Sequence, residues 1–198
     1  MQDDTVFRIV IVVGMVVIFP IAAYHRLKSM ASGEKLDRRA EGLFILLTLR
    51  PIALARMAAI IAYLVNPAWM AWSSVELPVW LRWLGVGIGL TAGTLLVVVM
   101  RSLGTNLTDT VVTREHHTLV TSGPYRWVRH PFYAAAALAV TADSLVTENW
   151  FLAVTGAATI ALLVMRTGTE EQRLIARFGD AYTDSMGRTG RFLPRLRG

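Results

Sequence analysis

The side chains that could carry chemistry gather in one stretch, Leu119–Tyr133, which reads LVTSGPYRWVRHPFY. It combines a Gly-Pro-Tyr turn at Tyr125 with an Arg-His-Pro helix entry at Arg129 and His130. Each signal has an ordinary structural explanation: arginines at a helix end often fix membrane topology, a His-Pro pair often caps a helix, and tyrosines often lie at membrane interfaces. Their joint occurrence between two apolar segments favours a binding site.

A second polar group follows in MRTGTEEQR, where Arg166 and Glu170 are four residues apart. These two side chains share one face if the helix is continuous between them. Solvated surface is the alternative explanation for Glu170 and Glu171. Because Pro131 after His130 can serve as the first residue of a helix, we expect both polar groups to meet at one end of a helix bundle.

The pair His116-His117 raises the question of a metal site. No third ligand lies at a sensible spacing from it, and protein zinc sites need three or four ligands. The chain has no cysteine, which excludes disulfides and thiolate sites. The sequence therefore predicts no metal.

The elements that position these residues are apolar helices. Of 198 residues, 54% are hydrophobic and 17% charged, and the mean hydropathy is +0.48; soluble domains carry about 25% charged residues. Spanning helices need about 20 mainly apolar residues, and five apolar segments occur: Ile9–Tyr24, Gly42–Val65, Trp83–Met100, Pro131–Val146 and Trp150–Met165. The predicted fold is an all-α polytopic membrane bundle of about five transmembrane helices, with a C-terminal cytoplasmic helix.

The basic residues indicate the orientation of this bundle. Segments 24–41, 101–130 and 166–198 contain five, four and seven Lys/Arg, which is 16 of the 20 in the chain, whereas loops 66–79 and 143–149 contain none. This alternation fits the positive-inside rule, so the net charge of +6 needs no nucleic-acid partner. The acidic start, MQDD, lacks the basic region of a secretory signal. We therefore expect a retained first span, an external N-terminus and a cytoplasmic C-terminus.

The organisation expected is a single membrane domain over residues 1–198. Residues 1–101 are expected to form the first three spans. Residues 102–198 are expected to form the half that carries both polar groups, with a connection, a two-helix hairpin turning at DSLVTEN and a cytoplasmic helix from Thr169. That helix places Leu174, Ile175, Phe178 and Tyr182 on one face. An amphipathic helix is expected over Glu34–Glu41, and Arg50-Pro51 should kink or interrupt the second segment.

The segment HTLVTSGPYRWVRHPFY, followed about forty residues later by TEEQRLIARFGDAYTDS, resembles the isoprenylcysteine carboxyl methyltransferase family. This wider group of integral-membrane enzymes includes phospholipid methyltransferases, and the resemblance covers roughly Leu103–Leu193. It implies a methyltransferase of the bacterial inner membrane that uses S-adenosylmethionine and releases S-adenosylhomocysteine. The acceptor would be lipophilic: an isoprenylcysteine-type carboxylate, a lipid or another small hydrophobic molecule.

The resemblance also implies site residues, carried over position by position. Arg166 would contact the acceptor and, with Glu170, act in catalysis. The cofactor positions would be His117, Thr118, Leu119, Val120, Tyr125, His130, Pro131, Phe132, Tyr133 and Glu170. One departure is Thr110, which stands where the isoprenylcysteine enzymes have a glutamine near the cofactor, so that contact and that acceptor do not transfer directly.

The implied chemistry is an in-line displacement at a sulfonium methyl, for which positioning supplies most of the effect, with effective molarities of about 10⁵ M or more. Backbone N–H groups near the turn, together with His130, would hold the cofactor carboxylate, and Glu170 would accept from its amine or ribose. Tyrosine faces suit the sulfonium, and Arg166 would orient an acidic acceptor bidentately. The acceptor would enter from the bilayer and the cofactor from the cytosol.

Two alternatives remain open at this point. One is a membrane reductase of the sterol-reductase type that uses a nicotinamide cofactor, although this chain is short for that class. The other is a non-catalytic membrane protein that binds lipid or a partner, which would tolerate substitution in the polar cluster.

Overall fold

The computed structural model describes residues 2–30, 43–104 and 118–195. Every regular element in these ranges is helical, apart from isolated bridges between single residue pairs. In chain order the elements are α1 (Gln2–Met30), α2 (Leu43–Val65), η2 (Pro67–Ser73), α3 (Val79–Leu103), η4 (Gly123–Arg126), α4 (Pro131–Thr147), α5 (Trp150–Phe178) and α6 (Asp180–Arg188).

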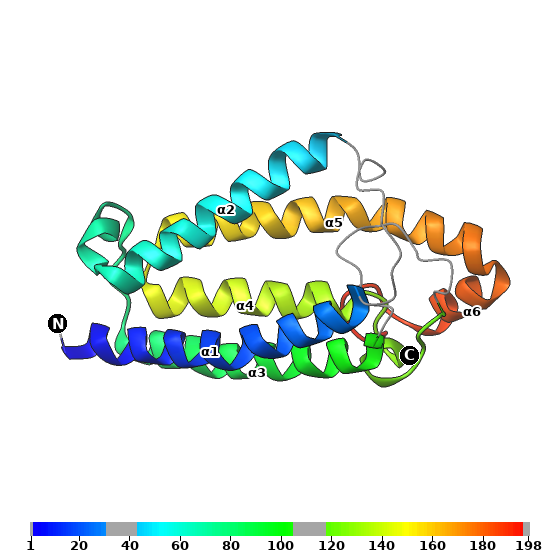
Figure 1. Cartoon of the computed structure of the whole chain (residues 1–198), viewed down its shortest axis with the longest axis horizontal. Helices are drawn as coiled ribbons and strands as arrows, with labels where there is room; N and C mark the ends of the chain where they lie inside the picture. Colours follow the sequence, from blue (N-terminus) through cyan, green and yellow to red (C-terminus); the bar gives the residue numbers. More distant parts are fainter. Residues whose placement is uncertain (1, 31–42, 105–117, 196–198) are drawn as a thin grey trace.

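The long helices α1 to α5 run up and down side by side (Figure 1). We call the end with η4 and α6 the site end, and the end with η2 and the α4–α5 turn the far end. α1, α2, α3 and α5 are long and apolar enough to cross a membrane. α4 has 17 residues, or about 25 Å at 1.5 Å per residue, which is near the lower limit for a span. The all-α polytopic membrane bundle is confirmed, whereas the number of five spans stays a prediction.

Helices α3 and α4 pack closely because a small residue lies at their contact. A Cβ atom added at Gly85 would lie 2.9 Å from the Leu145 Cβ and 3.0 Å from the Ala142 carbonyl oxygen. Small residues at such positions let helix backbones approach in a membrane, where association depends on van der Waals packing. This contact fixes α4, which begins at the polar cluster, against α3.

The far end is held by a buried arginine. Arg82, only 4% exposed, pairs with Asp4 of α1 and with Glu148, each at 3.1 Å. Its Nε donates to the Val146 carbonyl at 3.1 Å. A buried cation needs such partners, because its desolvation is otherwise costly. The far end is therefore closed by a polar contact among α1, α3 and the α4–α5 turn.

A second ion pair lies inside the bundle. The Arg56 guanidinium of α2 pairs with the Asp143 carboxylate of α4, and it also donates to the Leu152 carbonyl of α5. The side chains of Arg56 and Asp143 are 10% and 25% exposed. One side chain therefore joins three helices.

The structure shows two helices to be continuous at positions where the sequence left an interruption open. Pro51 lies inside α2 and does not interrupt it, because a long helix packed against α5 tolerates one missing backbone hydrogen bond; the kink expected at Arg50-Pro51 stays a prediction. α5 continues beyond the apolar segment that ends at Met165 and reaches Phe178, so the helix is continuous through Gly168; one glycine costs a helix only about 1 kcal/mol.

The chain then turns at Gly179, whose φ of +54° strongly favours glycine, and α6 begins. The predicted single cytoplasmic helix is thus the tail of α5 plus a separate helix. The apolar face expected on that single helix is therefore split between α5 and α6. Tyr182 on α6 is 4% exposed, whereas Ile175 on α5 is 38% exposed. α4 and α5 follow each other as a hairpin, and the Asn149 side chain caps α5 by accepting a 3.1 Å hydrogen bond from the Leu152 N–H. The helix expected over Glu34–Glu41 lies outside the described residues.

Candidate active site

The connection before α4 folds as the sequence predicts. η4 begins at Gly123, whose φ is +59°, and the Tyr125 N–H donates to the Ser122 carbonyl at 3.2 Å. His130 is the residue before the helix and Pro131 is its first residue. This turn leaves His130 and Tyr133 at the start of α4, beside the tail of α5.

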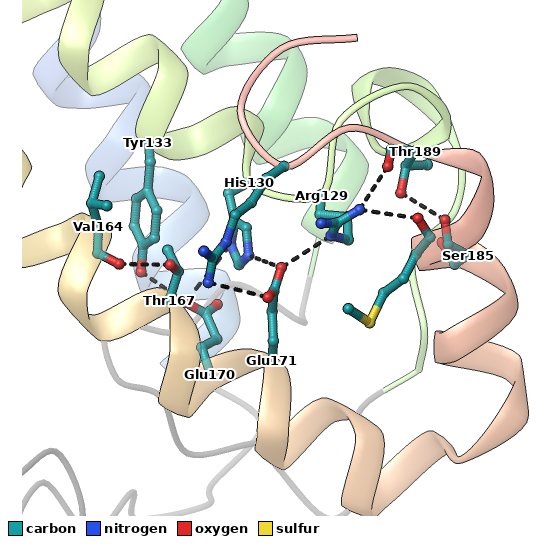
Figure 2. A network of polar contacts seen from close by, with 11 residues as sticks. Arg129, His130, Tyr133, Val164, Thr167, Glu170, Glu171, Ser185 and Thr189 are labelled. Atoms are coloured by element: carbon teal, nitrogen blue, oxygen red, sulfur yellow. Dashed lines mark hydrogen bonds and ion pairs between the residues drawn. The ribbon is translucent and has the colours of Figure 1, made fainter. Parts of the chain in front are cut away.

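His130 is almost fully buried, with 5% exposure. Its Nε2 lies 3.1 Å from Glu171 Oε1, and its Nδ1 lies 3.9 Å from Glu170 Oε2. The imidazole is parallel to the Tyr133 ring, with centroids 5.5 Å apart and planes at 3°. The ring is therefore fixed on one edge by a carboxylate and on one face by an aromatic ring (Figure 2).

Glu170 lies near the stacked rings of His130 and Tyr133, on the Nδ1 side of His130. The Tyr133 hydroxyl donates to Glu170 Oε2 at 2.8 Å, and Arg166 also interacts with that hydroxyl. Because α5 is continuous through Gly168, Arg166 and Glu170 lie one turn apart on the same face. The structure thus brings Tyr133 together with both polar residues of the second motif.

Tyr125 completes the cluster from η4. Burial raises the pKa of the Tyr125 hydroxyl, and the neighbouring Glu170 and Tyr133 raise it further. A phenol in this environment stays protonated at neutral pH, so Tyr125 is available as a hydrogen-bond donor.

Glu171 is the residue that the sequence reasoning missed. Its Oε1 accepts from Arg129 Nε at 3.0 Å, and its Oε2 pairs with Arg191 Nη2 at 3.2 Å. The side chain is 12% exposed, against 29% for Glu170. Adjacency to Glu170 was visible in the sequence, but the partner at Arg191 is twenty residues away across α6 and carries no local signal.

The other predicted positions are placed as follows. Thr118 is exposed and Leu119 and Val120 are half-buried, in a segment without regular structure before η4. Pro131 is buried and Phe132 is half-buried. His117, with Thr110 and His116, lies outside the described residues. No group of three or more His, Asp or Glu that could hold a metal occurs within the ranges that the structure describes.

Comparisons with known proteins point to one family. Residues 85–176 match the model of the isoprenylcysteine carboxyl methyltransferase family. Protein-S-isoprenylcysteine O-methyltransferase of Rattus norvegicus is 32% identical over 130 residues, covering 64% of this chain and 46% of the relative. Cobalt-zinc-cadmium resistance protein CzcN of Cupriavidus metallidurans is 36% identical over 85 residues, covering 42% of this chain and 38% of that protein. The chain thus spans less than half the length of these relatives.

The fold has a solved counterpart. The structure of the eukaryotic intramembrane Ras methyltransferase ICMT superposes with a TM-score of 0.56 at 21% identity, covering 89% of this chain and 64% of that one. The matched residues 85–176 include α4, the η4 turn and the glutamates of α5. Over these residues the chain is similar to the isoprenylcysteine carboxyl methyltransferase family.

Proposed function

We propose that this protein is a membrane methyltransferase that moves the methyl group of S-adenosylmethionine to a lipophilic acceptor. The observation that carries the proposal is the contact of His130 and Tyr133, at the start of α4, with Glu170 on α5. These positions match the family motif, and they lie where a bilayer-facing helix continues beyond its apolar part.

The residues present fit this cofactor chemically. Glu170 keeps 29% of its side-chain exposure, so its carboxylate can accept from an amine or from ribose hydroxyls. The Tyr125 and Tyr133 rings beside it offer electron-rich faces to a sulfonium, a contact worth about 0.5–2 kcal/mol.

Tyr182 supplies a further sign of a missing polar group. Its hydroxyl is buried and has no hydrogen-bond partner within the described residues. Burial raises the pKa of this hydroxyl, and the neighbouring charge of Glu171 raises it further. A buried, protonated donor without a partner costs free energy, so a polar ligand in this region would be stabilised by it.

S-adenosylmethionine, when bound, would supply an electrophilic methyl group on a sulfonium. The protein's part is to orient two reactants and to keep water away, which suits a cluster built on buried helix ends. Tyr133 holds the Glu170 carboxylate in one orientation. Arg166 interacts with the same hydroxyl, so its guanidinium is held at the edge of this cluster.

The acceptor is proposed to be lipophilic because of the residues beside Arg166. Val164 and Met165, directly before it on α5, are 39% and 63% exposed. Exposed apolar side chains on a membrane helix face lipid. An acceptor with an apolar tail and a polar head could therefore lie along α5 with its head at Arg166.

Ligand binding to the detergent-purified protein tests this proposal. We expect S-adenosylhomocysteine to bind and NADPH not to bind. We expect Glu170→Ala and Tyr133→Phe each to weaken the binding of S-adenosylhomocysteine. Binding of NADPH instead would favour the membrane reductase. Binding of neither nucleotide would favour a non-catalytic protein. Methyl transfer to a small S-prenylated cysteine, compared with transfer to phospholipid vesicles, then identifies the acceptor class.

A further inference from the structure

The chain beyond the family match returns to the candidate site. Residues 189–192 lie after α6, outside the matched range 85–176. Val128 and Gly190 form a parallel bridge. The Arg129 N–H donates to the Gly190 carbonyl at 2.8 Å, and the His130 N–H donates to the Arg191 carbonyl at 3.0 Å. The backbone that carries His130 is therefore held by this later segment.

Side chains hold the same two segments together. Arg129 Nη1 donates to the carbonyls of Met186 at 3.2 Å and Thr189 at 2.6 Å, at the end of α6. The Phe192 ring lies 5.8 Å from the His130 ring. The end of α6 and the segment after it are thus attached to both residues that precede α4.

Glu171 connects these attachments to α5. One carboxylate accepts from Arg129 and His130 and pairs with Arg191 (Figure 2 shows it between His130 and Arg129). A carboxylate is an acceptor only, so the His130 Nε2 that faces it carries a proton. His130 Nδ1 lies on the Glu170 side of the ring instead.

We propose that Glu171 is a positioning residue: together with residues 189–192 it fixes the His130 ring with Nε2–H toward itself and Nδ1 toward the ligand side. This rests on the proposed function for the identity of the ligand. Glu170, more exposed and bonded to Tyr133, contacts the ligand; Glu171, buried among two arginines and a histidine, acts through His130. The two adjacent glutamates therefore have different tasks.

Nitrogen NMR of the ligand-free protein tests the ring directly. The chain has four histidines, so the ¹⁵N spectrum is simple, and a His130→Gln variant identifies the resonances of His130. We expect a single state with the proton on Nε2 in the parent. Glu171→Gln removes the negative charge that pairs with Arg129 and Arg191 and that faces His130 Nε2. In this variant we expect His130 to populate both tautomers. A control, Asp184→Asn, removes an exposed carboxylate on α6 and leaves His130 unchanged.

Binding of S-adenosylhomocysteine is the second readout. We expect Glu171→Gln to weaken it by about tenfold or more, the equivalent of one charge-assisted hydrogen bond, and Asp184→Asn to leave it unchanged. Unchanged binding in Glu171→Gln overturns the inference, and so does weaker binding with an unchanged His130 spectrum, which indicates a structural role.

Two further outcomes are also decisive. If Glu171→Gln does not fold, Arg191→Met removes only one of its partners, on a side chain that is 40% exposed; unchanged binding and an unchanged His130 spectrum in that variant overturn the inference. If the parent protein fails to bind S-adenosylhomocysteine, the proposed function fails, while the spectrum of the ligand-free protein still decides whether Glu171 positions His130.

Discussion

Removal of the Arg56 guanidinium should destabilise the bundle strongly. In Arg56→Met the Asp143 carboxylate loses its cation and stays three-quarters buried, since its side chain is only 25% exposed. Breaking a buried ion pair by removing one partner costs about 3–5 kcal/mol. The remaining exposure of Asp143 places the expected loss near the lower limit, at about 3 kcal/mol.

The double variant separates the charge from the packing. Arg56→Met with Asp143→Leu leaves no unpaired charge, and replacing a buried pair by apolar residues is often close to neutral. We expect its free energy of unfolding to lie within about 1 kcal/mol of the parent value, which implies a coupling between the two positions of about 2 kcal/mol or more.

Reversible unfolding of the purified protein in mixed detergent and SDS micelles, followed by circular dichroism, measures these differences. Arg188→Met is the control, because it removes an arginine from the exposed surface of α6, and a change within about 0.5 kcal/mol is expected. The reasoning is refuted if Arg56→Met unfolds like the parent, or if the double variant is no more stable than the single one.

Three further predictions concern topology, packing and catalysis. The chain has no cysteine, so Glu76→Cys at the far end and Asp184→Cys on α6 each add one thiol; a membrane-impermeant maleimide should label only Glu76→Cys in intact cells, and labelling of both would contradict the orientation. Gly85→Val should lower the free energy of unfolding by about 1–3 kcal/mol, because the added side chain overpacks against α4. Gly87→Val, with open space at its Cβ position, should lower it less, and equal losses would argue against the close α3–α4 contact. Arg166→Lys should keep S-adenosylhomocysteine affinity but lower methyl transfer about tenfold, or 1.4 kcal/mol, because lysine cannot bond bidentately; unchanged turnover would leave Arg166 as a topology determinant.

Local signals predicted much of this structure. The lengths of the apolar segments predict the five long helices. Gly-Pro followed by His-Pro predicts the η4 turn and the start of α4 at Pro131. The spacing of Arg166 and Glu170 predicts a common face once the helix is continuous. These predictions depend on residues within a few positions of one another, which is the range over which sequence patterns report.

What could not be predicted depends on contacts between distant residues. The helix could end before or after Gly168, because the cost of one glycine is small compared with packing. The role of Glu171 depends on Arg129, 42 positions earlier, and on Arg191 beyond a second helix. The Arg56–Asp143 pair joins residues 87 positions apart. Each of these contacts exists only after the bundle has assembled.

The attachment of residues 186–191 to Arg129 and His130 has a consequence for biogenesis. Chains are synthesised from the N-terminus, and their parts become available for folding in that order. Helices α1 to α4 can enter the bilayer while the backbone N–H groups of Arg129 and His130 still lack the carbonyls of Gly190 and Arg191. Formation of the site must therefore wait until α5 and α6 have both emerged, so a ribosome paused before residue 186 would hold an inserted bundle whose His130 is not yet fixed.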